Sequence, residues 1–170
     1  SADLKYAISK LTEYDTVHSY EKFLSVDGRV KDAYVILGNM RMLRYSNLVL
    51  TTWWLISREE RARYTALEAI LSAIPLLARG GMNLATSLNL TLMAISLSVV
   101  DGEFSSAISK IQETQEFIKS ASENLIKAKQ QLEDADYNAL DANEKLTFLA
   151  LLEISDSLLI FSETLINVSY

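Results

Sequence analysis

Residues that end a helix or reverse the chain are scarce in this sequence. Its 170 residues include five Gly and a single Pro, whereas sheet proteins of this size need many more turn residues. Apolar residues recur at spacings of three and four along most of the chain, and no sustained alternation of apolar and polar residues indicates a strand. The sequence therefore predicts an all-α protein.

The few stop signals divide the chain into six expected helices. Asp27-Gly28, Gly80-Gly81 and Asp101-Gly102 each end one helix, and Pro75 kinks or shortens the last turn before Gly80. Two capping boxes, Ser57 to Glu60 and Asp141 to Glu144, each begin another. The expected helices span residues 4–24, 29–57, 58–79, 82–100, 103–133 and 142–168.

The helix expected over 103–133 has the cleanest pattern. Its 4-3 seam consists of Phe104, Ile108, Ile111, Gln115, Ile118, Ser122, Leu125, Lys129 and Leu132, with Ala107, Thr114, Ala121 and Ala128 beside it. Small residues seven apart allow a neighbouring helix to approach closely. With short connections throughout, we expect a six-helix antiparallel bundle or a stack of helical hairpins, forming a single all-helical domain over residues 1–170.

Two segments of the chain look alike. Residues 25–33 and 99–107 share an apolar residue, Asp-Gly, an apolar residue two positions later, and Ala five positions after the Gly. This arrangement resembles the mid-repeat turn of tetratricopeptide repeats, and the resemblance implies a helical hairpin at each segment. The Trp and Leu-Gly positions of the first repeat helix and the closing Pro are not matched, so we interpret it as a hairpin signature only.

The composition excludes several chemistries. With no Cys and one His, His18, disulfide scaffolds, thiolate metal sites and multi-histidine metal sites are excluded. No Gly-rich phosphate loop and no Glu-x-x-His pair occur, and we interpret the acidic residues of the last two helices as solvated surface or a docking face. We therefore expect neither an enzyme nor a cofactor.

Charge is unevenly distributed. The net charge is −6, and residues 1–79 carry 11 basic and 9 acidic side chains while residues 80–170 carry 5 and 13. The overall balance argues against general nucleic-acid binding. The split itself favours docking of the basic half on the acidic half within one chain, and head-to-tail association of identical chains is the alternative.

A basic and aromatic region is the first candidate for an interaction site. Its residues are Arg41, Arg44, Tyr45, Trp53, Trp54, Arg58, Arg61 and Arg63. Arginine beside stacking aromatics suits a polyanion or a nucleic acid. Because Glu59, Glu60 and Glu68 are interleaved with it, an Arg-rich face paired with the acidic half is the favoured interpretation.

Residues 80–100 form the second candidate, because they are 21 residues without a charge. This length could cross a bilayer. Polar residues such as Asn83, Ser87 and Asn89 interrupt the segment and favour the central helix of a bundle packed on all sides. Contact with a membrane remains an alternative.

From these observations we expect a non-catalytic α-helical interaction or assembly subunit, self-associating or docking a protein partner. Large groups such as Tyr6, Tyr20, Phe148 and Phe161 exceed the needs of one small core. An open assembly would make the chain a structural subunit of a filament, coat or virion, and a closed one a homo-oligomer. The charged N-terminal sequence shows no signal-peptide pattern, which favours the cytoplasm.

Overall fold

The computed structural model describes the backbone of residues 2–46 and 58–169, and the side chains of residues 2–30, 32 and 58–167. Over these ranges the fold is all-α, as predicted, with five α-helices instead of six. They are α1 (Ala2–Thr12), α2 (Thr16–Ser46), α3 (Arg58–Val99), α4 (Phe104–Glu133) and α5 (Ala142–Ser169), with a 3-10 turn, η2 (Tyr137–Ala139), before α5.

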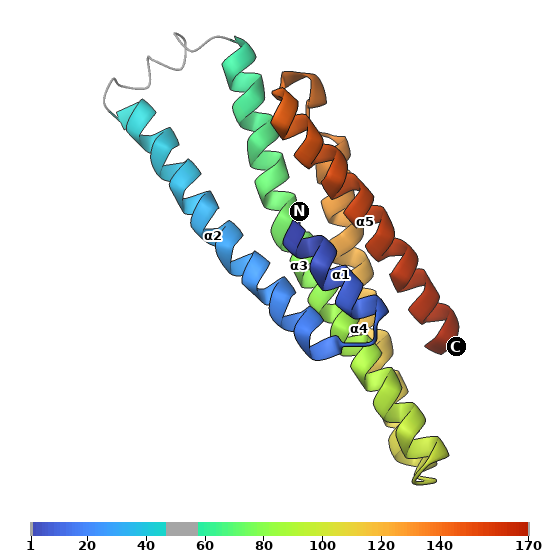
Figure 1. Cartoon of the computed structure of the whole chain (residues 1–170). Coiled ribbons are helices and arrows are strands. Elements are labelled where there is room, and N and C mark those ends of the chain that lie inside the picture. Colours follow the sequence, from blue (N-terminus) through green and yellow to red (C-terminus); the bar gives the residue numbers. More distant parts are fainter. Residues whose placement is uncertain (1, 47–57, 170) are drawn as a thin grey trace.

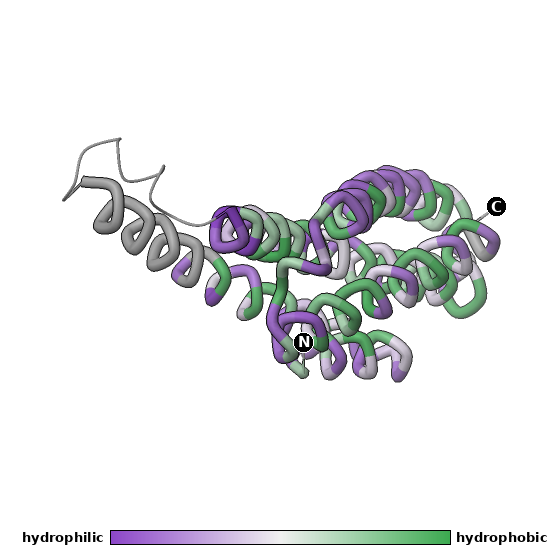
Figure 2. Tube along the Cα trace, turned by 90° about the horizontal axis from the view of Figure 1, so that it is seen from above, coloured by the Kyte–Doolittle hydropathy of each residue, from purple (hydrophilic) through white to green (hydrophobic). Residues whose placement is uncertain are grey.

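Helix α3 is the centre of the bundle. It forms an antiparallel hairpin with α4 and also contacts α1, α2 and α5. Helix α2 lies along one side of this hairpin with α1 folded back against it, and α5 lies along the other side (Figure 1). Hydrophobic and hydrophilic residues alternate in bands around the helices when the bundle is seen from above (Figure 2).

One core cluster contains residues of all five helices. Its fully buried large side chains are Leu4, Leu11, Phe23, Leu77, Leu84, Leu125, Leu132, Leu151, Ile154 and Leu158. Buried hydroxyls find partners within this core: Ser19 Oγ donates to the carbonyl of Ala7 at 2.8 Å, and the hydroxyls of Ser122 and Ser162 lie 2.7 Å apart. Packing of the apolar faces of the outer helices on and around α3 therefore holds the bundle together.

The expected helix over 4–24 is wrong, because the chain breaks at Tyr14. This residue has a φ of 63°, the left-handed region, and its side chain is 65% exposed. Asp15 then caps α2, with its Oδ1 accepting the backbone N–H of His18 at 3.3 Å. The apolar spacing continues through the break, and this concealed it in the sequence.

The expected stop at Asp27-Gly28 is also wrong, because α2 continues through both residues. Asp27 is 5% exposed and its Oδ1 lies 3.9 Å from Nε of Arg79 on α3. Only the second of the two similar segments is therefore a turn, where Gly102 has a φ of 68°. The hairpin signature shared by residues 25–33 and 99–107 does not hold for the first of them.

The expected stop at Gly80-Gly81 is wrong as well, and the helices expected over 58–79 and 82–100 are one helix with Pro75 inside it. Both glycines are buried where neighbouring helices cross α3. A Cβ at position 80 would lie 2.7 Å from the Leu125 side chain of α4, and one at position 81 would overlap the Phe23 ring of α2. The doublet therefore permits close packing instead of ending the helix.

The other boundaries that fall within the described residues are confirmed, whereas the end of the helix expected over 29–57 lies outside them. Helix α3 begins at Arg58, and Ser57 of its expected cap lies outside the described residues. Helix α4 spans almost the expected range. The Asp141 box caps α5, because Oδ1 of Asp141 accepts the Glu144 N–H at 2.8 Å and Oε1 of Glu144 accepts the Asp141 N–H at 2.9 Å.

Candidate interaction surface

The register of the α3–α4 hairpin is fixed by two side-chain hydrogen bonds. Asn83 Nδ2 donates to Ser120 Oγ at 3.2 Å, and Ser72 Oγ donates to Gln131 Oε1 at 3.0 Å. Antiparallel helices advance by equal steps in opposite directions, so this register also places Ile95 level with Ile108 and Val99 level with Phe104. We call residues 91–111 the hairpin tip.

The hairpin tip extends beyond the ends of the other helices (Figure 1). The first residue of α2, Thr16, donates its hydroxyl to Asn89 at 3.4 Å, so α2 begins beside residue 89 of α3. At the other side of the hairpin, Ile166 near the end of α5 lies beside Ile118 and Gln115 of α4. Residues 104–114 of α4 then continue for about 16 Å past this level.

Large apolar side chains are exposed all around the hairpin tip. They are Leu92, Met93, Ile95, Val99, Val100, Phe104 and Ile108, with exposed fractions from 38% to 77%. Only the seam between the two helices is buried there, through Thr91, Ala94 and Ala107. At roughly 100 Å² for each partly exposed side chain, the tip presents about 700 Å² of apolar surface over all its sides, and about 400 Å² of it, from Ile95, Val99, Phe104 and Ile108, lies on one side. This is comparable with the largest patch of about 300–600 Å² on a typical monomer, which is often functional.

One side of the hairpin tip is hollowed into an apolar groove of about 310 Å³. It is lined by Thr91, Ala94, Ile95 and Ser98 of α3 and by Phe104, Ala107, Ile108 and Ile111 of α4. Phe104, Ile108 and Ile111 belong to the same seam of α4 as Ser122 and Lys129, which contact Ser162 and Asp156 of α5. The groove therefore continues the surface on which α5 packs.

The hairpin tip has few charges. Residues 80–100 carry none, and the connection carries Asp101 and Glu103. On α4, Nζ of Lys110 lies 3.4 Å from a carboxylate oxygen of Glu113. No cluster of three or more potential metal-binding side chains occurs in the described part of the chain. The lining of the groove suits apolar contact and supplies no acid, base or nucleophile pair.

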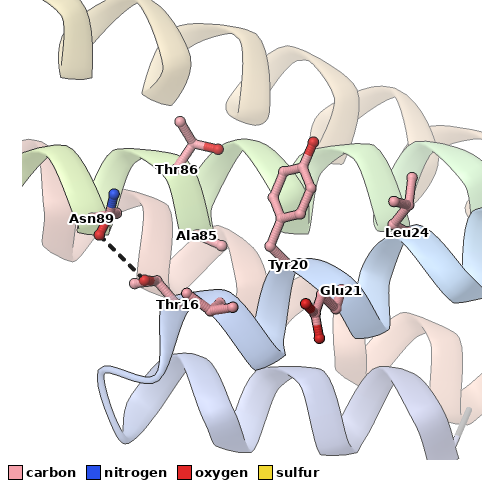
Figure 3. A pocket seen from close by; sticks show the side chains of 8 residues that line it. Thr16, Tyr20, Glu21, Leu24, Ala85, Thr86 and Asn89 are labelled. Atoms are coloured by element: carbon pink, nitrogen blue, oxygen red, sulfur yellow. Dashed lines mark hydrogen bonds between the residues drawn. The ribbon is translucent and has the colours of Figure 1, made fainter.

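A second groove of about 390 Å³ lies between α2 and α3. Val17, Tyr20 and Leu24 of α2 line it and are 63%, 41% and 52% exposed. Figure 3 shows Tyr20 and Leu24 extending from α2 toward α3, with the hydrogen bond between Thr16 and Asn89 at one end of the groove. This surface is also apolar, but it has fewer exposed apolar side chains than the hairpin tip.

The basic and aromatic candidates are only partly within the described structure. The side chains of Arg41, Arg44, Tyr45, Trp53 and Trp54 lie outside the described residues. Arg58, Arg61 and Arg63 lie in the first turns of α3, where Arg58 and Arg63 are exposed and Arg61 is half-buried.

Arg63 joins the two halves of the chain. Its guanidinium binds Glu144 at 2.9 Å and Asp141 at 3.1 Å, at the capping box of α5. The hydrogen bond to Glu144, and then the Glu144 charge, raise the pKa of Arg63 above its usual range. Arg29 and Arg79 instead pair with Asp3 and Asp27 of the same half. The internal docking expected from the charge split is therefore present at Arg63.

The hairpin tip could not be recognised as a site from the sequence. The spacing of Phe104, Ile108 and Ile111 correctly indicates part of a helix seam, and an uncharged run precedes it. The pattern does not say how far the neighbouring helices extend along that seam, and this decides which part is exposed.

No family model, no curated protein and no solved structure matches this chain. Among the described helices, α3 alone has the length and composition to cross a membrane, with 39% of its most apolar window buried within the bundle. A core helix of a bundle passes the same test, so this finding does not distinguish the two. We therefore infer the function from the exposed surface of the fold.

Proposed function

We propose that this protein is a non-catalytic helical interaction or assembly subunit, which buries its hairpin tip against a protein partner or another copy of itself. The supporting observation is the apolar tip left uncovered by α1, α2 and α5. An apolar patch of this size promotes aggregation of a soluble chain unless a partner covers it.

The energetics are sufficient for association. At about 25 cal/mol per Å², burial of about 400 Å² of apolar surface on each of two partners contributes on the order of 20 kcal/mol. Association costs about 4–15 kcal/mol in lost freedom of motion. The two helices of the tip are held by their own hydrogen bonds and seam, so little further ordering is needed on binding.

A catalytic role is not proposed, because the groove of the hairpin tip is lined by apolar and hydroxyl side chains, and the groove between α2 and α3 adds only a single carboxylate, Glu21, and the amide of Asn89. A polyanion site at the Arg-rich region is supported less well, since Arg63 is already engaged by two carboxylates. If the contacts propagate instead of closing, the same surface would serve a structural subunit of a filament, coat or virion.

Membrane contact is the second candidate, and the apolar composition of α3 favours it. Insertion of the hairpin tip would carry Asp101 and Glu103 at its apex into hydrocarbon. Burying a carboxylate without a partner is costly. An anionic bilayer surface would also repel the two acids, so a protein partner is favoured.

The test is the mass of the purified chain in solution, measured by light scattering without detergent over a dilution series at low and high salt. Binding of a dye that fluoresces on apolar surfaces is measured alongside. We expect either a multimer that persists in high salt, or a monomer that binds the dye at its tip. A chain that stays monomeric at high concentration and binds no dye contradicts the proposal.

A further inference from the structure

We infer that the partner of the hairpin tip is the tip of a second copy of this chain, and that the two tips pack antiparallel about a twofold axis. This inference rests on the proposed function, because it assigns an occupant to the same surface. Three observations support it: the groove continues the surface of α4 on which α5 packs, the tip has enough apolar area, and its charges are suitably placed.

The first observation is the continuity. Helix α5 packs antiparallel to α4 along its seam and ends beside Gln115, and the empty groove follows directly along the same seam. The occupant should therefore be another helix, in line with α5 and antiparallel to α4. In a twofold dimer with its axis near residue 107, Asp101 of one copy lies level with residue 113 of the other, short of the end of α5 at Gln115. The partner's α4 then meets both conditions, and Ile108 and Phe104 of each copy enter the groove of the other.

The second observation is the area. A specific interface buries about 800 Å² on each partner, of which about 57% is apolar, close to the roughly 400 Å² of apolar surface on the groove side of the tip. Two antiparallel hairpins packed side by side form a four-helix arrangement, in which each helix gains the second neighbour that it lacks in one chain. A twofold axis uses one surface twice, so no second apolar patch is required.

The third observation is the charge pattern. Asp101 and Glu103 lie at the apex of the tip. A parallel arrangement would bring the acids of both copies together. The antiparallel arrangement separates the two apices by about 15 Å along the helices, so these like charges do not face each other.

The chain offers a matched pair of variants for the test. Ile108 and Ile126 are both 57% exposed on α4. They are 18 residues apart, which is five full turns, so both point to the same side of one helix. Ile108 lies in the hairpin tip and Ile126 lies beside α5. The variants Ile108→Glu and Ile126→Glu therefore differ in location and in little else.

We expect the unmodified chain to sediment at about twice its mass of 19.1 kDa. Ile108→Glu should raise the dissociation constant of the dimer by at least about 100-fold, because a carboxylate is buried in each half of the interface. Ile126→Glu should leave that constant within about 3-fold, as expected for a surface position. Val99→Glu, at 77% exposure, repeats the test if Ile108→Glu folds poorly by circular dichroism.

The direction of packing is tested with a thiol cross-linker, since the chain contains no Cys. Ser105→Cys lies near the axis and should be linked between copies by a short bis-maleimide. Gln112→Cys lies five residues from the axis, so two copies of it would be about 15 Å apart along the helices and should not be linked. Efficient linkage through Gln112→Cys indicates a parallel pair and overturns the antiparallel arrangement.

The outcomes separate this inference from the proposed function. If the chain is a monomer whose tip binds the dye, and Ile108→Glu abolishes that binding, the second copy is not the partner and the tip is an interaction surface for another protein. If the chain is a dimer that dissociates with Ile126→Glu but not with Ile108→Glu, the chain self-associates through a surface other than the tip. A chain that is monomeric and floats with phosphatidylcholine–phosphatidylglycerol vesicles overturns both in favour of a membrane.

Discussion

Replacing single glycines by alanine tests the packing of α2 on α3 directly. In a helix interior this change gains about 1 kcal/mol of stability from helix propensity alone. Gly28 lies within α2 with open space where a methyl group would stand, and Gly81 lies within α3 against the Phe23 ring, which is fully buried. The two substitutions should therefore have opposite signs.

The magnitudes follow from these contacts. Gly28→Ala should raise the unfolding free energy by up to about 1 kcal/mol, which is about 2–4 °C in Tm for a chain of this length. At Gly81 a new methyl group overlaps a rigid ring, and overpacking costs about 1–3 kcal/mol or more. Because the overlap involves three ring atoms, we expect a cost of about 2–3 kcal/mol. After the gain in propensity, Gly81→Ala should lose about 1–2 kcal/mol and lower Tm by about 2–8 °C.

Thermal unfolding followed by circular dichroism, at one fixed protein concentration, measures both shifts. A double-mutant cycle with Phe23→Leu assigns the cost, because removing the ring should relieve most of the loss caused by Gly81→Ala. If Gly81→Ala stabilises the protein, α2 does not pack on α3 at this level. If Gly28→Ala destabilises it, Asp27-Gly28 is a turn after all and the continuity of α2 is refuted.

Three further substitutions have defined outcomes. The hydrogen bond from Lys22 and then the charge of Arg29 hold the pKa of Asp3 below 3.8. The ionised Asp3 therefore stabilises the folded state above that pH, and this stabilisation is lost as the pH falls through the lowered pKa. Asp3→Asn should lower the unfolding free energy near neutral pH and leave it unchanged in strong acid. Equal losses at both pH values would contradict this explanation. Asp141→Ala should cost about 1 kcal/mol in urea unfolding, since the cap of α5 is lost. Gly102→Ala, at a φ of 68°, should cost about 1–2 kcal/mol in the same assay, and no loss would mean that the connection can refold without strain.

The fold class and most helix boundaries could be predicted because they depend on local signals. The Asp141 box satisfies backbone N–H groups within four residues, so the sequence alone identifies it. The glycines could not be interpreted in this way. Gly102 reverses the chain and Gly81 accommodates a ring from another helix, and both functions are open to a glycine. Only the tertiary neighbours distinguish them.

The exposure of the hairpin tip depends on a single break that the sequence did not reveal. Helix α2 is antiparallel to α3 and begins beside Asn89. Had one straight helix covered residues 4–24, as the apolar spacing indicated, its first twelve residues would extend about 18 Å past Asn89 and reach the end of the tip. The left-handed Tyr14 instead turns α1 back along the bundle, where Leu4 and Leu11 join the core. The same turn that completes the core therefore leaves the tip without a neighbour from the described part of its own chain, and this is the surface on which we propose that a second chain packs.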